Sequence, residues 1–292
     1  MDCISDMKLE CGEGPLWDSA AQCLYWTDAV AKAIYVYDRE TETVKTHYDQ
    51  FQAGGITLHE EGGLILGGGE GFAHLQSDGT LRLIPHDCDG IKVDKINDII
   101  ADPRGRIFCG QEAYDDDGYE PGYMFRIDPD GTARVIEEGI AVSNGLGFSP
   151  DLKTLYAIDS IPRNIYAYDY DIETGDISNR RILSTFAQED GLPDGMTVDS
   201  DGFLWVAHWF GSAVSRLDPD GKLERRIDTP YAQTSSVMFG GADLSELYIT
   251  SAGLLWESPV APLGFDYGPE RGGPTLRLQT DFTGKEEFKA KI

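Results

Sequence analysis

The sequence predicts an all-β chain folded as a six-bladed β-propeller, with four-stranded blades around a central channel. Three observations support this prediction. Strand-like segments rich in Tyr, Ile, Val, Leu and Trp dominate the chain, turn motifs separate them, and the pattern recurs about every 40–50 residues. Six such units arranged radially leave only short sheet edges. Two β-sandwich domains are the structural alternative, but they do not explain the spacing.

The strands are separated by a recurrent turn sequence. Residues 102–105, 128–131 and 218–221 each begin with Asp-Pro and end with Gly. Proline presets φ for the turn and glycine supplies a positive φ, so each motif predicts a hairpin between two strands.

Each repeat opens with a similar segment, and the first residues of these segments lie 41, 43, 47, 50 and 41 positions apart. The opening residues, in chain order, are Glu13, Gly54, Asn97, Asn144, Asp194 and Ser235. The whole chain, 1–292, is therefore expected to form one propeller domain. Residues 7–10 are expected to complete the last blade as its outer strand and so close the ring.

Composition limits the classes of partner. Hydrophobic residues make up 41% of the 292 residues, enough for a sizeable core, and 24 basic against 51 acidic residues give a formal net charge of −27. This charge repels phosphate backbones and anionic lipid, so neither nucleic acid nor a membrane surface is an expected partner. Most of the acids fall in turns, where they favour solubility, and we expect a monomer or a small homo-oligomer.

The cellular setting is also predicted. Residues 1–13 lack the basic start and apolar stretch of a signal peptide, and no apolar run approaches the ~18 residues of a membrane span. The five cysteines are irregularly spaced and form no CxxC pair, so neither a zinc knuckle nor a disulfide framework is indicated. A reducing, cytoplasmic location fits this pattern best.

The repeat also predicts which rim of the propeller carries function. The first strand of each blade lines the channel, and the loops between second and third strands share a rim with the starts of the first strands. The loops 111–122 and 253–273 are long, whereas the other turns are mostly short. Long loops on a rigid scaffold often carry function, so the working face is expected where the first strands begin.

Four of the six openings, Asn97, Asn144, Asp194 and Glu13, carry carboxylate or carboxamide groups at one register. Asn and Asp at strand starts commonly cap turns, and that is the alternative interpretation. However, two anionic groups at one end of one channel repel each other unless a cation lies between them. These oxygens suit Ca²⁺, Mg²⁺, Mn²⁺ or Zn²⁺, so a divalent cation is the expected cofactor.

The chain resembles the senescence-marker-protein/gluconolactonase family, which includes regucalcin and bacterial sugar lactonases. Several motifs carry the resemblance in the family's order and span almost the whole chain: Gly12-Glu-Gly-Pro-Leu-Trp-Asp18, Ile96-Asn-Asp98 with Asp102-Pro-Arg-Gly105, Ser143-Asn-Gly-Leu-Gly-Phe-Ser-Pro150, Asp194-Gly-Met-Thr-Val-Asp199 with Gly202-Phe-Leu-Trp-Val-Ala207, and the segment Phe239-Gly-Gly-Ala-Asp-Leu-Ser-Glu-Leu-Tyr-Ile-Thr250. The resemblance implies a six-bladed propeller with one divalent cation in the channel.

The resemblance also implies roles for individual residues. The metal ligands of the family fall on Glu13, Asn144 and Asp194, and its substrate-contacting Asn falls on Asn97. An acidic substrate contact falls on Asp115 by ungapped spacing.

Glu112 is a close competitor of Asp115 for that contact. The chain departs from the pattern at Lys95, where some members have Arg, and at the Gly54-Gly55 opening, which lacks a polar side chain. His208 and Trp209 follow at the end of a strand on the working rim, and their role is left open.

These features together predict a gluconolactonase-like lactone hydrolase, an enzyme that converts a sugar lactone to the aldonic acid. A divalent ion would polarise the carbonyl, and Asp194 would activate water as the catalytic base. Asn97, Lys95 and Asp115 would bind sugar hydroxyls. Two alternatives remain open: hydrolysis of another ester-like bond, such as a phosphotriester, and a non-catalytic propeller that serves as a binding platform.

Overall fold

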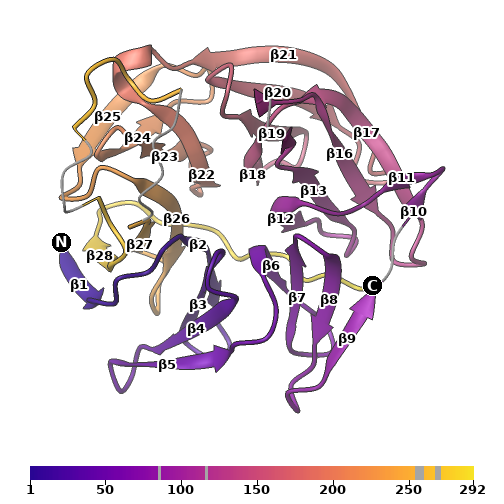
Figure 1. Cartoon of the computed structure of the whole chain (residues 1–292), viewed down its shortest axis with the longest axis horizontal. Helices are drawn as coiled ribbons and strands as arrows, with labels where there is room; N and C mark the ends of the chain where they lie inside the picture. Colours follow the sequence, from indigo (N-terminus) through magenta and orange to yellow (C-terminus); the bar gives the residue numbers. More distant parts are fainter. Residues whose placement is uncertain (85–86, 116–117, 254–259, 267–270) are drawn as a thin grey trace.

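Six four-stranded antiparallel sheets surround a common centre in the computed structural model (Figure 1). The structure describes residues 1–84, 87–115, 118–253, 260–266 and 271–292, without the side chains of 114–115 and 118–119. The predicted six-bladed β-propeller with four-stranded blades is thus confirmed. No helix in the described ranges has the length and apolar character needed to span a membrane.

The first five sheets follow the chain from the inside outward. The first sheet contains β2 (Gly12–Asp18), β3 (Cys23–Asp28), β4 (Ala33–Asp38) and β5 (Thr43–Tyr48), and the second contains β6 (Ala53–Leu58), β7 (Leu64–Gly68), β8 (Gly71–Leu75) and β9 (Leu81–Ile84). The third contains β12 (Ile96–Ala101), β13 (Ile107–Gln111), β16 (Gly122–Ile127) and β17 (Ala133–Ile140), and the fourth contains β18 (Ser143–Phe148), β19 (Thr154–Asp159), β20 (Asn164–Tyr170) and β21 (Ile177–Thr185). The fifth contains β22 (Leu192–Val198), β23 (Leu204–Trp209), β24 (Ala213–Leu217) and β25 (Leu223–Asp228).

The short elements lie in connections between strands. They are the ribbons β10 (Asp87–Cys88) with β11 (Ile91–Lys92) and β14 (Tyr114–Asp115) with β15 (Gly118–Tyr119), and the 3₁₀ turn η1 (Gln188–Asp190).

Both chain ends contribute to the sixth sheet, which contains β26 (Thr234–Gly240), β27 (Glu246–Ser251), β28 (Thr275–Gln279) and β1 (Asp2–Ser5). Asp2 lies opposite Arg277 in the pairing of β1 with β28. The N-terminal strand that forms the outer edge of this sheet is thus residues 2–5, and not residues 7–10 as expected from the sequence. Leu9 is instead buried with Trp17 and Trp26, because the chain has already left the sheet edge to enter the first blade.

The Asp-Pro turns fold as their sequence predicts. The Gly131 amide donates to the Asp128 carbonyl at 2.8 Å, and the Gly105 amide donates to the Asp102 carbonyl at 2.9 Å. Gly105 and Gly131 have φ of 83° and 86°, a left-handed conformation that glycine adopts without a steric cost. Each motif therefore closes a hairpin and fixes the register of its two strands.

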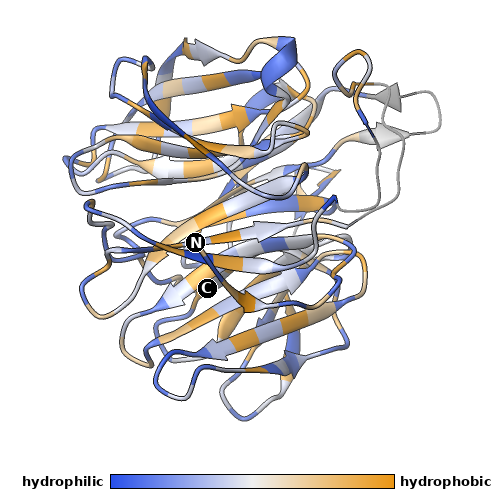
Figure 2. Ribbon diagram, turned by 90° about the vertical axis from the view of Figure 1, so that its left-hand side faces the viewer, coloured by the Kyte–Doolittle hydropathy of each residue, from blue (hydrophilic) through white to orange (hydrophobic). Residues whose placement is uncertain are grey.

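The hydrophobic core lies between neighbouring blades. Trp26 and Trp205 are fully buried, and apolar clusters join each blade to the next. The outermost strands, such as β5 and β25, are largely exposed. In the side view, apolar residues follow the strands, whereas the turns at both edges are mostly hydrophilic (Figure 2). Sheet-on-sheet packing around the ring therefore holds the innermost strands in place around the channel.

Residues 280–292, here called the strap, cross the centre of the ring (yellow in Figure 1). The strap binds the turns between first and second strands. The Ser200 amide donates to the Thr283 carbonyl at 2.8 Å, and the Lys291 amide donates to the Gly105 carbonyl at 3.0 Å. The channel thus has a strap end and, where the innermost strands begin, an entry end.

Candidate metal centre

All six innermost strands shift register near their first residues, at the entry end. The shifts fall between Glu13 and Leu16, Ala53 and Gly55, Ile96 and Asp98, Asn144 and Leu146, Pro193 and Met196, and Thr234 and Val237. A bulge bends a strand and redirects the side chains beside it. Because the bulges recur at one register, the opening residues of different blades are presented to one end of the channel.

The position after each opening is mostly glycine, because neighbouring blades approach closely there. A Cβ on Gly195 would collide with the Ser236 side chain, and a Cβ on Gly145 would meet the backbone of Met196. The third and sixth blades differ, with Asp98 and Ser236 at this position. Both residues line the channel cavity, so Asp98 of the third blade adds a further acid to the ring beside Glu13 and Asp194.

Glu13 is the carboxylate of the first blade. It lies at the start of β2 opposite Thr27 and is partly buried. Its Oε2 accepts a hydrogen bond from the Gly14 amide at 3.0 Å. Gly14 has a φ of 52°, so the bulge places an amide beside the carboxylate.

The Asn144 and Asp194 side chains lie on adjacent blades and are 7% and 4% exposed. The Asn144 amide donates to the Ser160 hydroxyl at 3.1 Å, and Ser160 donates to the Pro193 carbonyl at 2.7 Å. A further hydrogen bond from Asn144 to the Asp194 carboxylate lowers the pKa of Asp194. The amide nitrogen is therefore committed to protein acceptors, which leaves Oδ1 as the atom able to bind a cation.

The site carries an excess of negative charge. Burial, followed by the charge of Asp98, raises the pKa of Glu13 to about 8. Burial and the charges of Glu13, Asp98 and Glu112 raise the pKa of Asp194. Among the described residues, no positive group offsets either shift. Buried carboxylates that repel each other in this way bind either a proton or a cation.

The donor set fits a divalent ion that keeps bound waters. Glu13 and Asp194 supply carboxylate oxygens and Asn144 supplies an amide oxygen, which are hard ligands. The described part of the chain contains no cluster of three His, Cys, Asp or Glu side chains suited to a metal. An ion here would therefore depend on Asn144 and on waters to complete its shell.

Asn97 and Lys95 lie on the third blade at the same end. The Asn97 amide donates to the Ser143 carbonyl at 2.9 Å, which leaves its Oδ1 as an acceptor for a ligand. Lys95 is exposed and has a φ of 51°. Its carbonyl accepts the Glu112 amide at 2.9 Å, so the backbone joins Lys95 to the long loop of this blade.

Glu112 shares the electrostatic environment of the centre. Burial raises the pKa of the Glu112 carboxyl, and its charge in turn raises the pKa values of Cys11, Glu13 and Asp194. The Asp115 side chain lies outside the described residues. Sequence spacing alone favoured Asp115, because the hairpin of β14 and β15 in this loop is not visible in the sequence.

His208 has a structural role. It is 2% exposed, its Nδ1 lies 2.8 Å from the Asp190 carbonyl oxygen, and its Nε2 lies 2.8 Å from the Ser215 hydroxyl. Burial lowers the pKa of His208 to about 4, so the ring is neutral near pH 7. Trp209 is partly buried, and its ring packs edge-on against Phe210.

Comparison with known proteins identifies the family. Residues 11–253 match the family described as SMP-30/Gluconolactonase/LRE-like region. The chain belongs to this family. The resemblance inferred from the sequence motifs is thereby confirmed, and the SMP-30/gluconolactonase match covers all six channel-lining openings.

Relatives in the SMP-30/gluconolactonase family are similar over nearly their full length. A pentonolactonase of Haloferax volcanii is 36% identical, covering 99% of this chain and 97% of the relative. A regucalcin of Pongo abelii is 34% identical, covering 94% and 92%. The solved structure of a luciferin-regenerating enzyme has a TM-score of 0.88 at 31% identity and covers 100% of this chain and 99% of its own. The name of the Haloferax relative agrees with the lactone-hydrolase class expected from the sequence.

Proposed function

We propose that this protein hydrolyses a sugar lactone to the corresponding aldonic acid with the help of one divalent cation. One observation supports this most strongly. The charge of Glu13 raises the pKa of the buried Asp194, Asn144 donates a hydrogen bond to the Asp194 carboxylate, and no positive group among the described residues offsets the pKa shifts of the two acids. The name of the Haloferax volcanii pentonolactonase supports lactones of sugars as the substrate class.

Glu13, Asn144 and Asp194 would hold the cation. When bound, a divalent ion in such a site polarises the lactone carbonyl and lowers the pKa of water. The chain itself contributes positioning: the Gly14 amide fixes one Glu13 oxygen, and Ser160 fixes the Asn144 amide. The bulged strands would thus present the three proposed ligands from three different blades.

Asp194 is the proposed general base. Water attacks the carbonyl carbon of the lactone while an Asp194 oxygen accepts its proton, and the ring C–O bond then breaks. The proton passes from Asp194 to the departing ring oxygen, which becomes the hydroxyl of the aldonic acid. Burial suits this cycle, because it raises the proton affinity of the carboxylate above that of an exposed Asp.

Asn97, Lys95 and an acid of the long loop would bind the sugar. The Asn97 Oδ1 accepts a sugar hydroxyl, because its nitrogen is bound to the Ser143 carbonyl. Lys95, exposed beside the entry end, would donate to a second hydroxyl. The acidic contact is proposed for Asp115 by sequence or for Glu112 by its proximity to the centre.

A lactone panel tests the proposal. Aldono-γ- and δ-lactones of pentoses and hexoses are assayed by acid release, after chelation and after addition of Ca²⁺, Mg²⁺, Mn²⁺ or Zn²⁺ in turn. We expect turnover of at least one sugar lactone, lost on chelation and restored by one of the ions. A phosphotriester serves as the control substrate. Preference for the phosphotriester, or lactone turnover that chelation leaves unchanged, would contradict the proposal.

A further inference from the structure

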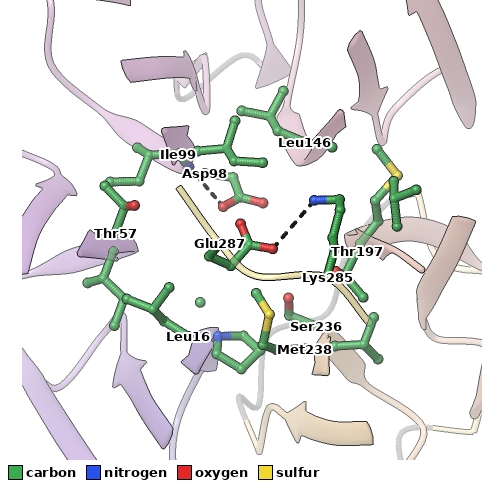
Figure 3. Close-up of a pocket in the computed structure, with 18 residues that line it drawn as sticks. Leu16, Thr57, Asp98, Ile99, Leu146, Thr197, Ser236, Met238, Lys285 and Glu287 are labelled. Atoms are coloured by element: carbon green, nitrogen blue, oxygen red, sulfur yellow. Dashed lines mark hydrogen bonds and ion pairs between the residues drawn. The ribbon is translucent and has the colours of Figure 1, made fainter. Parts of the chain in front are cut away.

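The strap inserts two charged side chains into the channel. Lys285 and Glu287 both line the central cavity and are only 17% and 9% exposed. Their side chains form an ion pair with 3.7 Å between Nζ and Oε1. In Figure 3 the strap crosses the cavity, and the Lys285 ammonium and the Asp98 and Glu287 carboxylates point into the same space.

The strap holds this pair rigidly. On one side, the Gly284 amide donates to the Leu244 carbonyl at 2.8 Å. On the other, the Ala290 amide donates to the Leu58 carbonyl at 2.8 Å, and Phe288 and Ile292 pack into an apolar cluster. Lys285 therefore lies in a segment fixed to blades on both sides of the ring.

The carboxylates beside Lys285 need a counter-charge. Asp98 occupies the register position where four other blades have glycine, and it accepts the Ile99 amide at 2.8 Å. Burial, and then the charge of Glu287, raises the pKa of Asp98 to about 6. Asp98 also raises the pKa values of Glu13 and Asp194, so its charge extends toward the entry end.

The space at the strap end suits an ion and excludes a sugar. The cavity has a volume of about 40 Å³ and is lined by the hydroxyl residues Thr57, Thr197 and Ser236 as well as by the charged side chains. A water position needs ~10–15 Å³ of such space, so a few waters or one small cation fit and a lactone does not. Carboxylates with hydroxyls form the ligand environment that hard cations prefer.

We propose that Lys285 is the resident cation of the strap end: its ammonium pairs with Glu287, beside Asp98, so that the channel takes one divalent ion, at the entry end, and not two. This inference rests on the proposed function, because it takes the Glu13–Asn144–Asp194 centre as the divalent site. A tethered ammonium is held in place by the chain and does not exchange with solvent, whereas a second divalent ion would add a further positive charge close to the first.

Metal stoichiometry tests the inference. Wild type and Lys285→Met are dialysed against Ca²⁺ or Mn²⁺ up to millimolar concentration, and bound metal is counted per chain. We expect one ion in wild type and two in Lys285→Met, since methionine keeps the stem and removes the charge. Lys285→Gln, which keeps a polar head, is expected to give the same count and stands in if the Met variant does not fold.

Three control variants separate charge from packing. Lys285→Arg keeps the positive charge and is expected to bind one ion. Lys291→Met removes another lysine of the strap, one that pairs with Glu60 at 3.1 Å outside the cavity, and is expected to bind one ion. Lys285→Met combined with Glu287→Gln removes one carboxylate of the new site and should return the count to one.

Two results would overturn the inference: two ions in wild type, or no gain of an ion in either neutral variant of Lys285. A count of zero in wild type with one in Lys285→Met would support the role of Lys285 while contradicting the proposed entry-end centre. Counts of zero in both would contradict both proposals. The two failures are therefore distinguishable.

Discussion

The side-chain amide of Asn144 donates to the hydroxyl of Ser160 at 3.1 Å, and Ser160 donates in turn to the carbonyl of Pro193 at 2.7 Å. Pro193 directly precedes Asp194. One buried hydroxyl thus joins the fourth blade to the fifth and fixes the orientation of one proposed metal ligand. Partners of this kind hold a ligand in the geometry that an ion requires.

Replacement of Ser160 by Ala is therefore expected to weaken metal binding. The Asn144 amide loses an acceptor and becomes able to turn its nitrogen toward the ion. We expect an affinity loss of ~10–100-fold, as is typical when a residue that orients a ligand is removed. Isothermal titration of the chelated protein with Ca²⁺ or Mn²⁺ measures this loss.

Ser251→Ala is the matched control. Ser251 is also buried and lies in the sixth blade, where its hydroxyl donates to a proline carbonyl, that of Pro274, at 2.6 Å and accepts the Gly273 amide, neither of which belongs to a proposed ligand. Both variants lose a comparable hydrogen bond, so both should lose similar thermal stability. Equal metal affinity in Ser160→Ala and Ser251→Ala would show that the link to Asn144 has no effect on the ion.

Asp194→Asn and Asn97→Ala separate chemistry from substrate binding. Asn keeps a side-chain oxygen at position 194 but removes the charge and the base, so turnover should fall by ~10²–10⁴-fold. Asn97→Ala removes a proposed substrate contact outside the three proposed ligands, and the expected loss in kcat/KM corresponds to ~1–3 kcal/mol with metal retained. Lactone kinetics at matched metal occupancy measure both effects.

The two variants also have outcomes that would contradict the roles proposed for Asp194 and Asn97. Comparable turnover in wild type and Asp194→Asn would remove Asp194 as the base. Loss of metal from Asn97→Ala would place Asn97 among the ligands and not in the sugar site. We expect both variants to fold, because both residues lie in the channel and not in the apolar clusters between blades. Circular dichroism checks this.

Repetition explains what the sequence could predict. Because each blade repeats one register, the alignment of Glu13, Asn97, Asn144 and Asp194 by spacing alone already placed them at one end of one channel. The Asp-Pro turns are local, so their hairpins were also predictable. Asp98 was missed as a site residue, although the sequence carries a signal for it: an acid at the position where four other openings have glycine.

The strap lay beyond sequence reasoning for a different reason. Residues 280–292 follow the last repeat, have no period and form no long strand, so nothing in their pattern indicates where they pack. Their place depends on hydrogen bonds to turns far away in the chain, such as that from the Lys291 amide to Gly105. The role proposed for Lys285 can be inferred only from the closed ring, in which the strap crosses the channel.

Glu112→Gln and Asp115→Asn decide which acid of the long loop faces the substrate. The charge of Glu112 raises the pKa values of Glu13 and Asp194, so Glu112 lies near the centre. We expect Glu112→Gln to raise KM for the lactone by ~10-fold or more, the scale of a lost hydrogen bond to a charged group. We also expect the variant to bind the metal less tightly than wild type, because it lacks one negative charge near the centre. Asp115→Asn is the matched control, and a larger KM change there would favour Asp115.

Stability of the metal-free protein should fall as the pH rises from about 7 to about 9. The pKa of Glu13 is about 8 in the folded chain and near 4.5 in the unfolded chain, so the folded state binds the additional proton between these values. Stability falls with rising pH wherever the folded state binds more protons. For a carboxyl with this shift, the loss between about pH 7 and about pH 9 is ~1.4 kcal/mol, or a few degrees in Tm.

Glu13→Gln isolates the contribution of that carboxyl. Burial also raises the thiol pKa values of Cys23 and Cys109, so these thiols ionise in this range only in the unfolded chain and contribute equally to wild type and variant. The difference in Tm between the two proteins therefore reports Glu13 together with its effect on Cys11 and Asp194, whose pKa values the Glu13 charge raises, and should shrink as the pH falls from about 9 toward about 6. In wild type, a divalent ion that saturates the site from about pH 6 to about pH 9 would keep Glu13 ionised over that range and should abolish its share of the slope. Thermal scans with chelator and with metal provide the measurement. A Tm difference between wild type and Glu13→Gln that stays constant from about pH 6 to about pH 9 would show that the Glu13 carboxyl is not held protonated in the channel.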